Sequence, residues 1–296
     1  MIGGSDQDNP FNWPNEMGKN NNAGDSLQQQ LDLLASKGGN AIRCVLSCRQ
    51  SEKSINGSDP SWAWPWKNTG TTTSPTYDVT QFDSAWFTRL NDFLSMAQSR
   101  DIVVLMEFWD KFDWKNNSDE NPWAVHPFRP ANNSNFTLSE LNVDTWDPSD
   151  NSPNPAFYAP PNISHPDLNN DSLILGHLES FVDRVLDETL QFDNVLFTDS
   201  NEIIMPTAYH EHWATFIQNR YSNAGRTAFV APMPNDPDLT SSNHQPLFNA
   251  SFPDHHNLSQ IHRDGDQHWN DLQLAFTETQ SDRPLTVGKF ANAWFG

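Results

Sequence analysis

The segment Asn194-Val-Leu-Phe-Thr-Asp-Ser-Asn-Glu202 decides which fold is expected for this chain. A short apolar run ends abruptly there, and the polar pair Asn201-Glu202 follows it. In a (β/α)8 barrel, buried strands present functional side chains from their carboxyl ends. The segment therefore predicts a buried strand that places a carboxylate at the rim of such a barrel.

Strands and helices are expected to alternate along the rest of the chain. Apolar runs predict strands over residues 40–47, 101–109, 194–202, 226–232, 258–262 and 283–289. Apolar residues at helical spacing predict helices over residues 26–36, 77–98, 172–190, 209–223 and 266–279. Repeated βα units imply a parallel sheet. We therefore expect an α/β fold, a TIM barrel that forms a single domain over residues 1–296.

Six strands can be placed, whereas a closed barrel needs eight. The first strand is expected near Met1–Phe11 and the eighth beyond Gly296, so the barrel is expected to be incomplete at these two strands. Residues 49–76 are expected to form a long loop. Residues 110–170, after strand three, are polar but carry scattered aromatic side chains, which favours a long, ordered, site-forming loop.

Three tryptophans alternate in the loop after strand two, in the segment Trp62-Ala-Trp-Pro-Trp66. In an extended segment this alternation places the three rings on one side. Two interpretations follow from the pattern. The rings form a platform on which sugars stack, or they fix the loop to the rim of the barrel.

Charge and composition exclude several classes of partner. Lys and Arg number 17 against 38 Asp and Glu, a net charge of -21. Such a surface repels nucleic-acid phosphates and anionic lipids, so we expect no nucleic-acid partner and no membrane. No apolar run approaches the roughly 20 residues of a membrane-spanning helix. The first residues lack the basic and apolar regions of a signal peptide, so none is expected in this chain.

Histidines and a carboxylate gather near residues 254–262. Asp254, His255, His256 and His262 are residue types that bind transition metals. Their spacing matches no compact metal motif, and neighbouring residues on a strand face opposite ways. Cys44 also lacks a zinc-type set of partners in the sequence. We therefore expect neither a metal ion nor another cofactor.

The order Arg43, then the strand over 101–109, then Asn201-Glu202 resembles the clan-A (β/α)8 glycoside hydrolases. More narrowly, the chain is similar to a set of uncharacterised bacterial glycosidase-like barrel proteins, over most of residues 26–290. Four segments carry this similarity, namely residues 123–133, 192–202, 258–260 and 283–289.

The resemblance implies a glycoside hydrolase that acts on a poly- or oligosaccharide. In that clan the Glu at the end of strand four is the general acid/base, which corresponds to Glu202, and the preceding Asn201 holds the sugar. Arg43, His262 at the end of strand six, and Trp109 at the end of strand three are further expected substrate contacts. Apolar neighbours of Glu202 would favour its protonated form. The acidity and the resemblance together favour a secreted or periplasmic protein.

A second carboxylate is harder to identify. A retaining glycosidase needs it about 5–5.5 Å from the acid and an inverting enzyme about 6.5–9.5 Å away. The clan places a Glu at the tip of strand seven, where this chain has Lys289. The substitutes that the sequence offers are Glu107, Asp110, Asp199, Asp264 and Asp266.

Lys289 also allows other interpretations. It would bind substrate, form an ion pair with Glu202, or form a Schiff base as in barrel aldolases. Because Lys289 stands in place of the nucleophile, the alternative function is a non-catalytic carbohydrate-binding barrel.

Overall fold

A computed structural model of the chain describes residues 9–11, 26–46, 64–71, 74–110, 113, 122–141, 171–201, 203–234, 236, 238–258, 265–278 and 283–286. The elements follow in the order α1 (Leu27–Ser36), β1 (Ala41–Val45), β2 (Trp66–Asn68), β3 (Tyr77–Phe82), α2 (Ser84–Gln98), β4 (Val103–Asp110), α3 (Pro122–Val125), the 3-10 helix η2 (Pro130–Asn132), α4 (Leu138–Leu141), α5 (Asp171–Thr189), β5 (Val195–Asn201), α6 (Thr207–Asn223), β6 (Val230–Ala231), α7 (Gln245–Asn249), β7 (His256–Asn257), α8 (Gly265–Glu278) and β8 (Leu285–Thr286).

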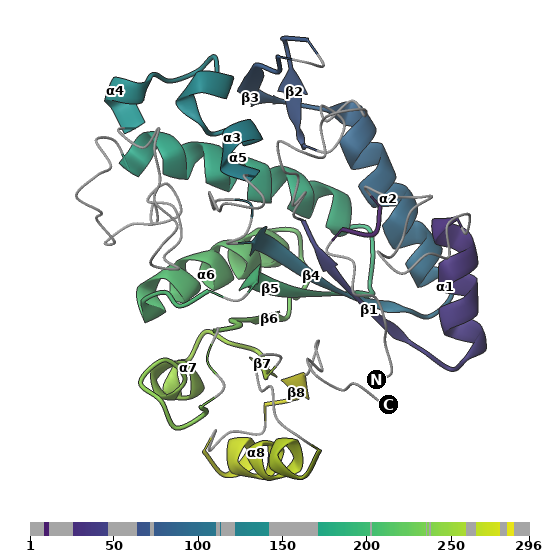
Figure 1. Cartoon of the computed structure of the whole chain (residues 1–296). Helices are drawn as coiled ribbons and strands as arrows, with labels where there is room; N and C mark the ends of the chain where they lie inside the picture. Colours follow the sequence, from purple (N-terminus) through teal and green to yellow (C-terminus); the bar gives the residue numbers. More distant parts are fainter. Residues whose placement is uncertain are drawn as a thin grey trace.

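A four-stranded parallel sheet in the order β1-β4-β5-β6 lies at the centre of the molecule (Figure 1). Ala41 is aligned with Val103, and Val104 with Val195. Every residue of β1 is buried, as is every residue of β4 after Val103. Strands with both faces covered are expected to be continuously apolar, which explains why these segments stand out in the sequence. The predicted strands at 40–47, 101–109, 194–202 and 226–232 are confirmed, the last shortened to two residues.

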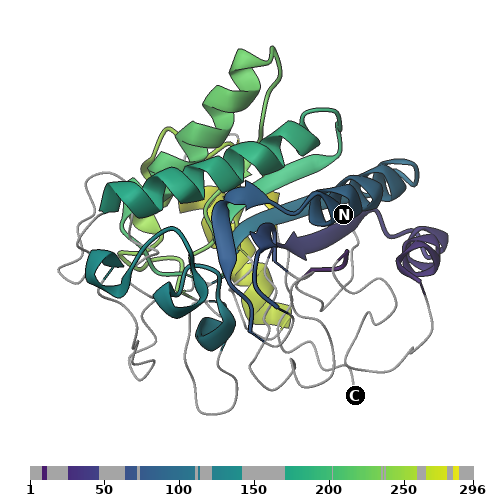
Figure 2. The ribbon, with the colours of Figure 1, turned by 90° about the horizontal axis from the view of Figure 1, so that it is seen from above.

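Helices α1, α2, α5 and α6 lie in succession along one side of this sheet (Figures 1 and 2). Aromatic side chains fill the space between sheet and helices. The ring of Trp109 on β4 lies 5.4 Å from Phe181 on α5 and 5.5 Å from Trp213 on α6, between ring centroids. The predicted helices at 26–36, 172–190, 209–223 and 266–279 are confirmed within two residues at each end.

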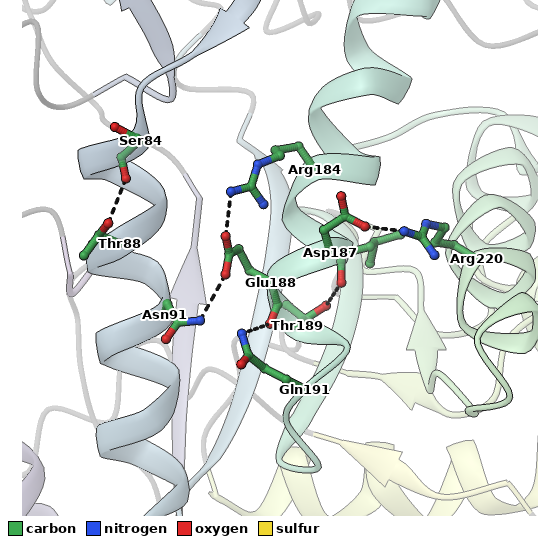
Figure 3. Close-up of polar contacts among 10 residues, drawn as sticks. Ser84, Thr88, Asn91, Arg184, Asp187, Glu188, Thr189, Gln191 and Arg220 are labelled. Atoms are coloured by element: carbon green, nitrogen blue, oxygen red, sulfur yellow. Dashed lines mark hydrogen bonds and ion pairs between the residues drawn. The ribbon is translucent and has the colours of Figure 1, made fainter.

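Polar side chains join α5 to its two neighbouring helices (Figure 3). Glu188 on α5 accepts hydrogen bonds from Asn91 of α2 at 3.0 Å and from Arg184 at 2.6 Å. On the other side, Arg220 of α6 forms ion pairs with Asp183 and Asp187. These contacts tie α5 to α2 on one flank and to α6 on the other.

The structure corrects the predicted boundary between loop and helix near residue 77. Tyr77–Phe82 is not the start of the helix but strand β3, which pairs antiparallel with β2. Helix α2 begins at Ser84 because the carboxylate of Asp83 accepts the amide N–H of Ala85, at 2.9 Å, and caps the helix. The segment predicted as a loop up to residue 76 therefore contains a strand, β2, of a hairpin.

The segment 122–136 after β4 packs on this hairpin. Asn135 accepts the amide N–H of Val79 at 2.7 Å, and the amide N–H of Ser134 donates to the carbonyl of Tyr77 at 2.9 Å. The buried imidazole of His126 lies 4.7 Å from the ring of Trp64. The described part of the predicted aromatic-rich loop is thus a layer held on the hairpin by backbone and side-chain hydrogen bonds. Trp114 and Trp146 lie outside the described residues.

The C-terminal part contains a separate parallel pair, β7 and β8, with His256 aligned to Leu285. Strand β7 at His256–Asn257 ends just before the strand predicted at 258–262, of which only Leu258 lies within the described residues. Asn257 donates a 3.3 Å hydrogen bond to Thr198 of β5, so β7 lies close to the central sheet. No strand pairing joins the two sheets among the described residues, and barrel closure therefore stays a prediction. Within the same residues, no helix has the length and apolarity to cross a membrane.

Candidate active site

An arginine and a glutamate form a buried pair on neighbouring strands. Nε of Arg43 on β1 lies 2.6 Å from Oε1 of Glu107 on β4, and Nη2 lies 2.7 Å from Oε2. Both side chains are almost fully removed from water, with exposed fractions of 9% and 0%. Two parallel charge-assisted hydrogen bonds fix the plane of the guanidinium as well as its position. The pair therefore holds the Arg43 side chain in one orientation next to the end of β5.

Asn201 at the end of β5 is held from both sides. Its Oδ1 accepts a 2.7 Å hydrogen bond from Nη2 of Arg43, and its Nδ2 donates to Oδ1 of Asp110 at 3.0 Å. Asp110 is aligned with Asn201 across the β4–β5 pair. The two bonds fix which end of the amide carries the oxygen, because a guanidinium only donates. Four side chains from three strands thus form one connected network.

Burial limits what this network can touch. Asn201 and Glu107 are inaccessible to water, and Asp110 is buried as well. The guanidinium of Arg43 donates hydrogen bonds to both Glu107 and Asn201. In this geometry the network supports the residue that follows Asn201. Direct sugar contacts by Asn201 and Arg43 stay predictions.

Glu202 itself lies outside the described residues, but its two neighbours are described. Asn201 belongs to the buried network, and Ile203 is buried and forms a parallel β-bridge with Pro234 after β6. The backbone on either side of residue 202 is therefore held by two adjacent strands. His262, Asp264 and Lys289 also lie outside the described residues, as do the side chain of Asp266 and the ring of Trp62.

Asp199 faces the helix layer. Its Oδ2 lies 2.5 Å from Nδ1 of His210 on α6, and its Oδ1 accepts a 3.1 Å hydrogen bond from Ser200. Both Asp199 and His210 are buried. His210 was not among the residues expected from the sequence, although it lies in the buried stripe of α6 with Trp213, Ala214 and Ile217. A histidine in an otherwise apolar stripe is the signal that would have found it.

The predicted aromatic contacts have different outcomes. The sugar-platform interpretation is wrong for Trp64 and Trp66, which are 2% and 3% exposed and belong to the main hydrophobic core. The alternative, a loop fixed by its tryptophans, agrees with this burial. The ring of Trp109 is buried and packs against Phe181 of α5 and Trp213 of α6. Its role as a sugar contact stays a prediction.

Two of the histidines near β7, His255 and His256, are buried. The described residues contain no group of three or more His, Cys, Asp and Glu side chains that could hold a metal ion. Burial lowers the pKa of His255 to about 4, and burial with the nearby charge of Arg283 lowers that of His256 to about 4 as well. Asp254 instead accepts hydrogen bonds from Gln218 and from the amide of Val230. Burial and the neighbouring Glu107 raise the pKa of the Cys44 thiol well above its ordinary value.

Comparison with known proteins adds information on the fold. No protein-family model matches the sequence, and no curated protein matches it. An endo-1,4-beta-mannanase from Rhizomucor miehei matches 87% of this chain and 71% of its own, with a TM-score of 0.51 and 14% identity. A glycoside hydrolase family 5 enzyme from Prevotella bryantii B14 matches 96% of this chain and 74% of its own, with a TM-score of 0.51 and 10% identity.

A family 5 mannosidase from Rhizomucor miehei matches 88% of this chain at a TM-score of 0.46 and 14% identity, and this chain spans only 61% of its length. At such low identities these matches show the fold alone. The resemblance to clan-A glycosidase barrels is therefore confirmed at the level of the fold, as a mixed α/β structure with a parallel sheet.

Proposed function

We propose that this protein is a glycoside hydrolase acting on a poly- or oligosaccharide, with Glu202 as general acid/base. The observation that carries the proposal is the buried network of Arg43, Glu107 and Asn201, which fixes the residue directly before Glu202. A general acid must lie within hydrogen-bonding reach of the leaving oxygen, and a misplacement of 1 Å costs about 100-fold in rate. The fold shared with family 5 glycosidases supports the same function.

In this proposal the residues have distinct roles. Glu202 protonates the glycosidic oxygen as the bond to the sugar breaks. Arg43, held by Glu107, orients Asn201, whose amide in turn fixes the direction of the chain at residue 202. His262, Trp109 and Lys289 remain proposed sugar contacts. A single (β/α)8-barrel domain over residues 1–296, to which β7 and β8 belong, is part of the proposal.

One observation favours the alternative, a carbohydrate-binding barrel without hydrolysis. The carboxylates of Glu107, Asp110 and Asp199 are buried, and each accepts a hydrogen bond from another side chain of the protein. Lys289 replaces the carboxylate that the resembling clan has on strand seven. A site without a water-activating carboxylate would bind a glycan and leave it intact.

Hydrolysis is the test that separates the two functions. We would screen plant and algal polysaccharides, β-1,4-mannan among them, for release of reducing sugars by the wild-type protein. The variant Glu202→Gln is expected to lose at least about 100-fold in rate, the contribution typical of a positioned acid or base. Glu211→Gln, an exposed residue of α6, is the matched control and should keep wild-type activity.

The outcomes are distinct. Undiminished hydrolysis by Glu202→Gln would exclude the proposed acid. Glycan affinity without any release of reducing sugar by the wild type would favour the binding function. Where hydrolysis occurs, the anomer of the fresh product, followed by NMR, distinguishes a retaining from an inverting arrangement of carboxylates.

A further inference from the structure

Asp199 and His210 join the end of β5 to the first turns of α6. The two residues are eleven positions apart, and Oδ2 of the aspartate lies 2.5 Å from Nδ1 of the histidine. Both side chains are 1% exposed. A carboxylate at this distance accepts, so Nδ1 carries the proton of this hydrogen bond. The remaining ring nitrogen, Nε2, is buried and has no hydrogen-bond partner among the described residues.

The position of this pair gives it a consequence for the proposed active site. Only residues 202–206 connect β5 to α6, and Asp199 and His210 lie on either side of that connection. Ile203 within it is held by the bridge to Pro234. A bond that closes so short a segment restricts the path of the chain between Asn201 and Thr207.

We infer that Asp199 and His210 are a positioning pair, which fixes how the chain leaves β5 and thereby where residue 202 lies. This inference rests on the proposed function for its catalytic consequence, but not for its structural one. In this inference Asp199 is not one of the reacting carboxylates, because its carboxylate is hydrogen-bonded to His210 of α6 and to Ser200.

The same helix supplies a matched comparison. His212, two residues further along α6, lies next to Glu179 of α5, with Nε2 and Oε1 3.2 Å apart. That pair also joins a histidine to a carboxylate, but it links two helices and not a helix to β5. Loss of either pair weakens the packing of α6. Only loss of the Asp199–His210 pair releases the connection after β5.

The kinetic experiment compares His210→Leu, His210→Asn and His212→Leu with the wild type. We expect kcat to fall about 100-fold in His210→Leu, as for a catalytic group displaced by about 1 Å, while KM changes less than about two-fold. In His210→Asn the amide nitrogen takes the place of Nδ1 and still donates to Asp199, so most of kcat should return. His212→Leu should keep wild-type kcat.

A second measurement does not depend on hydrolysis. Backbone amide hydrogen exchange over residues 200–207 should accelerate at least about ten-fold in His210→Leu and stay unchanged in His212→Leu. Asp199→Leu, which is close in size but has no acceptor for Nδ1 of His210, should give the same faster exchange if His210→Leu does not fold.

The outcomes separate the two proposals. A wild type that hydrolyses no glycan overturns the proposed function, and exchange alone then decides the positioning role. Equal kcat or equal exchange in His210→Leu and His212→Leu overturns the positioning pair. A loss of kcat that His210→Asn does not restore overturns it too.

Discussion

Replacing Glu107 by glutamine tests whether the buried ion pair supports the site or takes part in the chemistry. The substitution keeps the shape of the side chain but turns one of the two acceptors of Arg43 into a donor. The guanidinium, which is 9% exposed, would then be buried without its countercharge. Removing one partner of a buried ion pair costs about 3–5 kcal/mol of folding free energy.

Urea denaturation measures this loss directly. With a slope of about 3 kcal/mol per molar urea, the midpoint of unfolding should fall by about 1–2 M while the slope stays constant. The double variant Arg43→Met/Glu107→Leu removes both charges and should recover part of the loss, because an apolar pair of similar volume carries no desolvation cost. Recovery will be incomplete, since Asn201 then loses the donor that satisfies its Oδ1.

Two results would refute this account of Glu107. A Glu107→Gln protein within about 1 kcal/mol of the wild type would mean that the pair does not support the fold. A double-mutant cycle compares Arg43→Met, Glu107→Leu and the variant with both substitutions. If their losses of folding free energy are strictly additive, Arg43 and Glu107 do not interact. Wild-type stability with hydrolysis abolished would instead identify Glu107 as a reacting carboxylate.

Three further predictions concern the whole molecule. His255 and His256 have folded-state pKa values of about 4 against 6.5 for an ordinary histidine. Between these pH values the unfolded chain binds more protons than the folded protein, so the free energy of unfolding should fall by about 2 kcal/mol for each unit by which the pH is lowered near pH 5. In pH-dependent urea titrations, the variant with Asn at both positions should show a smaller slope. The net charge of -21 predicts a higher melting temperature when salt rises from about 0.1 to about 1 M, because the screening length falls from about 10 to about 3 Å; calorimetry showing a fall would contradict this. Arg220→Leu should cost about 1 kcal/mol in urea unfolding, since Asp183 and Asp187 lose their shared countercharge and repel one another one turn apart on α5, and no change would mean that these ion pairs are fully offset by solvation.

The sheet and its helices could be predicted from the sequence because their signals are local. Buried parallel strands are continuous apolar runs, as in β4. Helix α1 begins at a capping box formed by Ser26 and Gln29, which is visible in the sequence. The hairpin was missed because the helical spacing of Phe82 and Trp86 extends one turn too far back. Only the capping residue Asp83 marks the true start of α2.

The site was harder to predict because it depends on contacts between residues far apart in the chain. Arg43 and Asn201 are 158 positions apart, and their contact requires the β1-β4-β5 strand order as well as its register. The alternation of Trp64 and Trp66 predicts a shared face but not whether that face meets water or the core. Likewise, the alternation along a strand puts Asp199 and Asn201 on the same side of β5, so it does not predict that Asp199 binds His210 of α6 while Asn201 binds Arg43 of β1.

The register of the sheet also ranks the candidates for the second carboxylate. Glu107 lies three residues below Asp110 on β4, which is about 10 Å deeper at about 3.3 Å per residue, and Asp199 is turned toward α6. Asp110 is aligned with Asn201, one residue before Glu202, on strands about 4.8 Å apart. Asp110 is therefore the described candidate closest to the end of β5, although its carboxylate is buried and accepts a hydrogen bond from Asn201. If the protein hydrolyses a glycan, an inverted product would support Asp110 as the second carboxylate, whereas a retained product would point to another carboxylate closer to the acid.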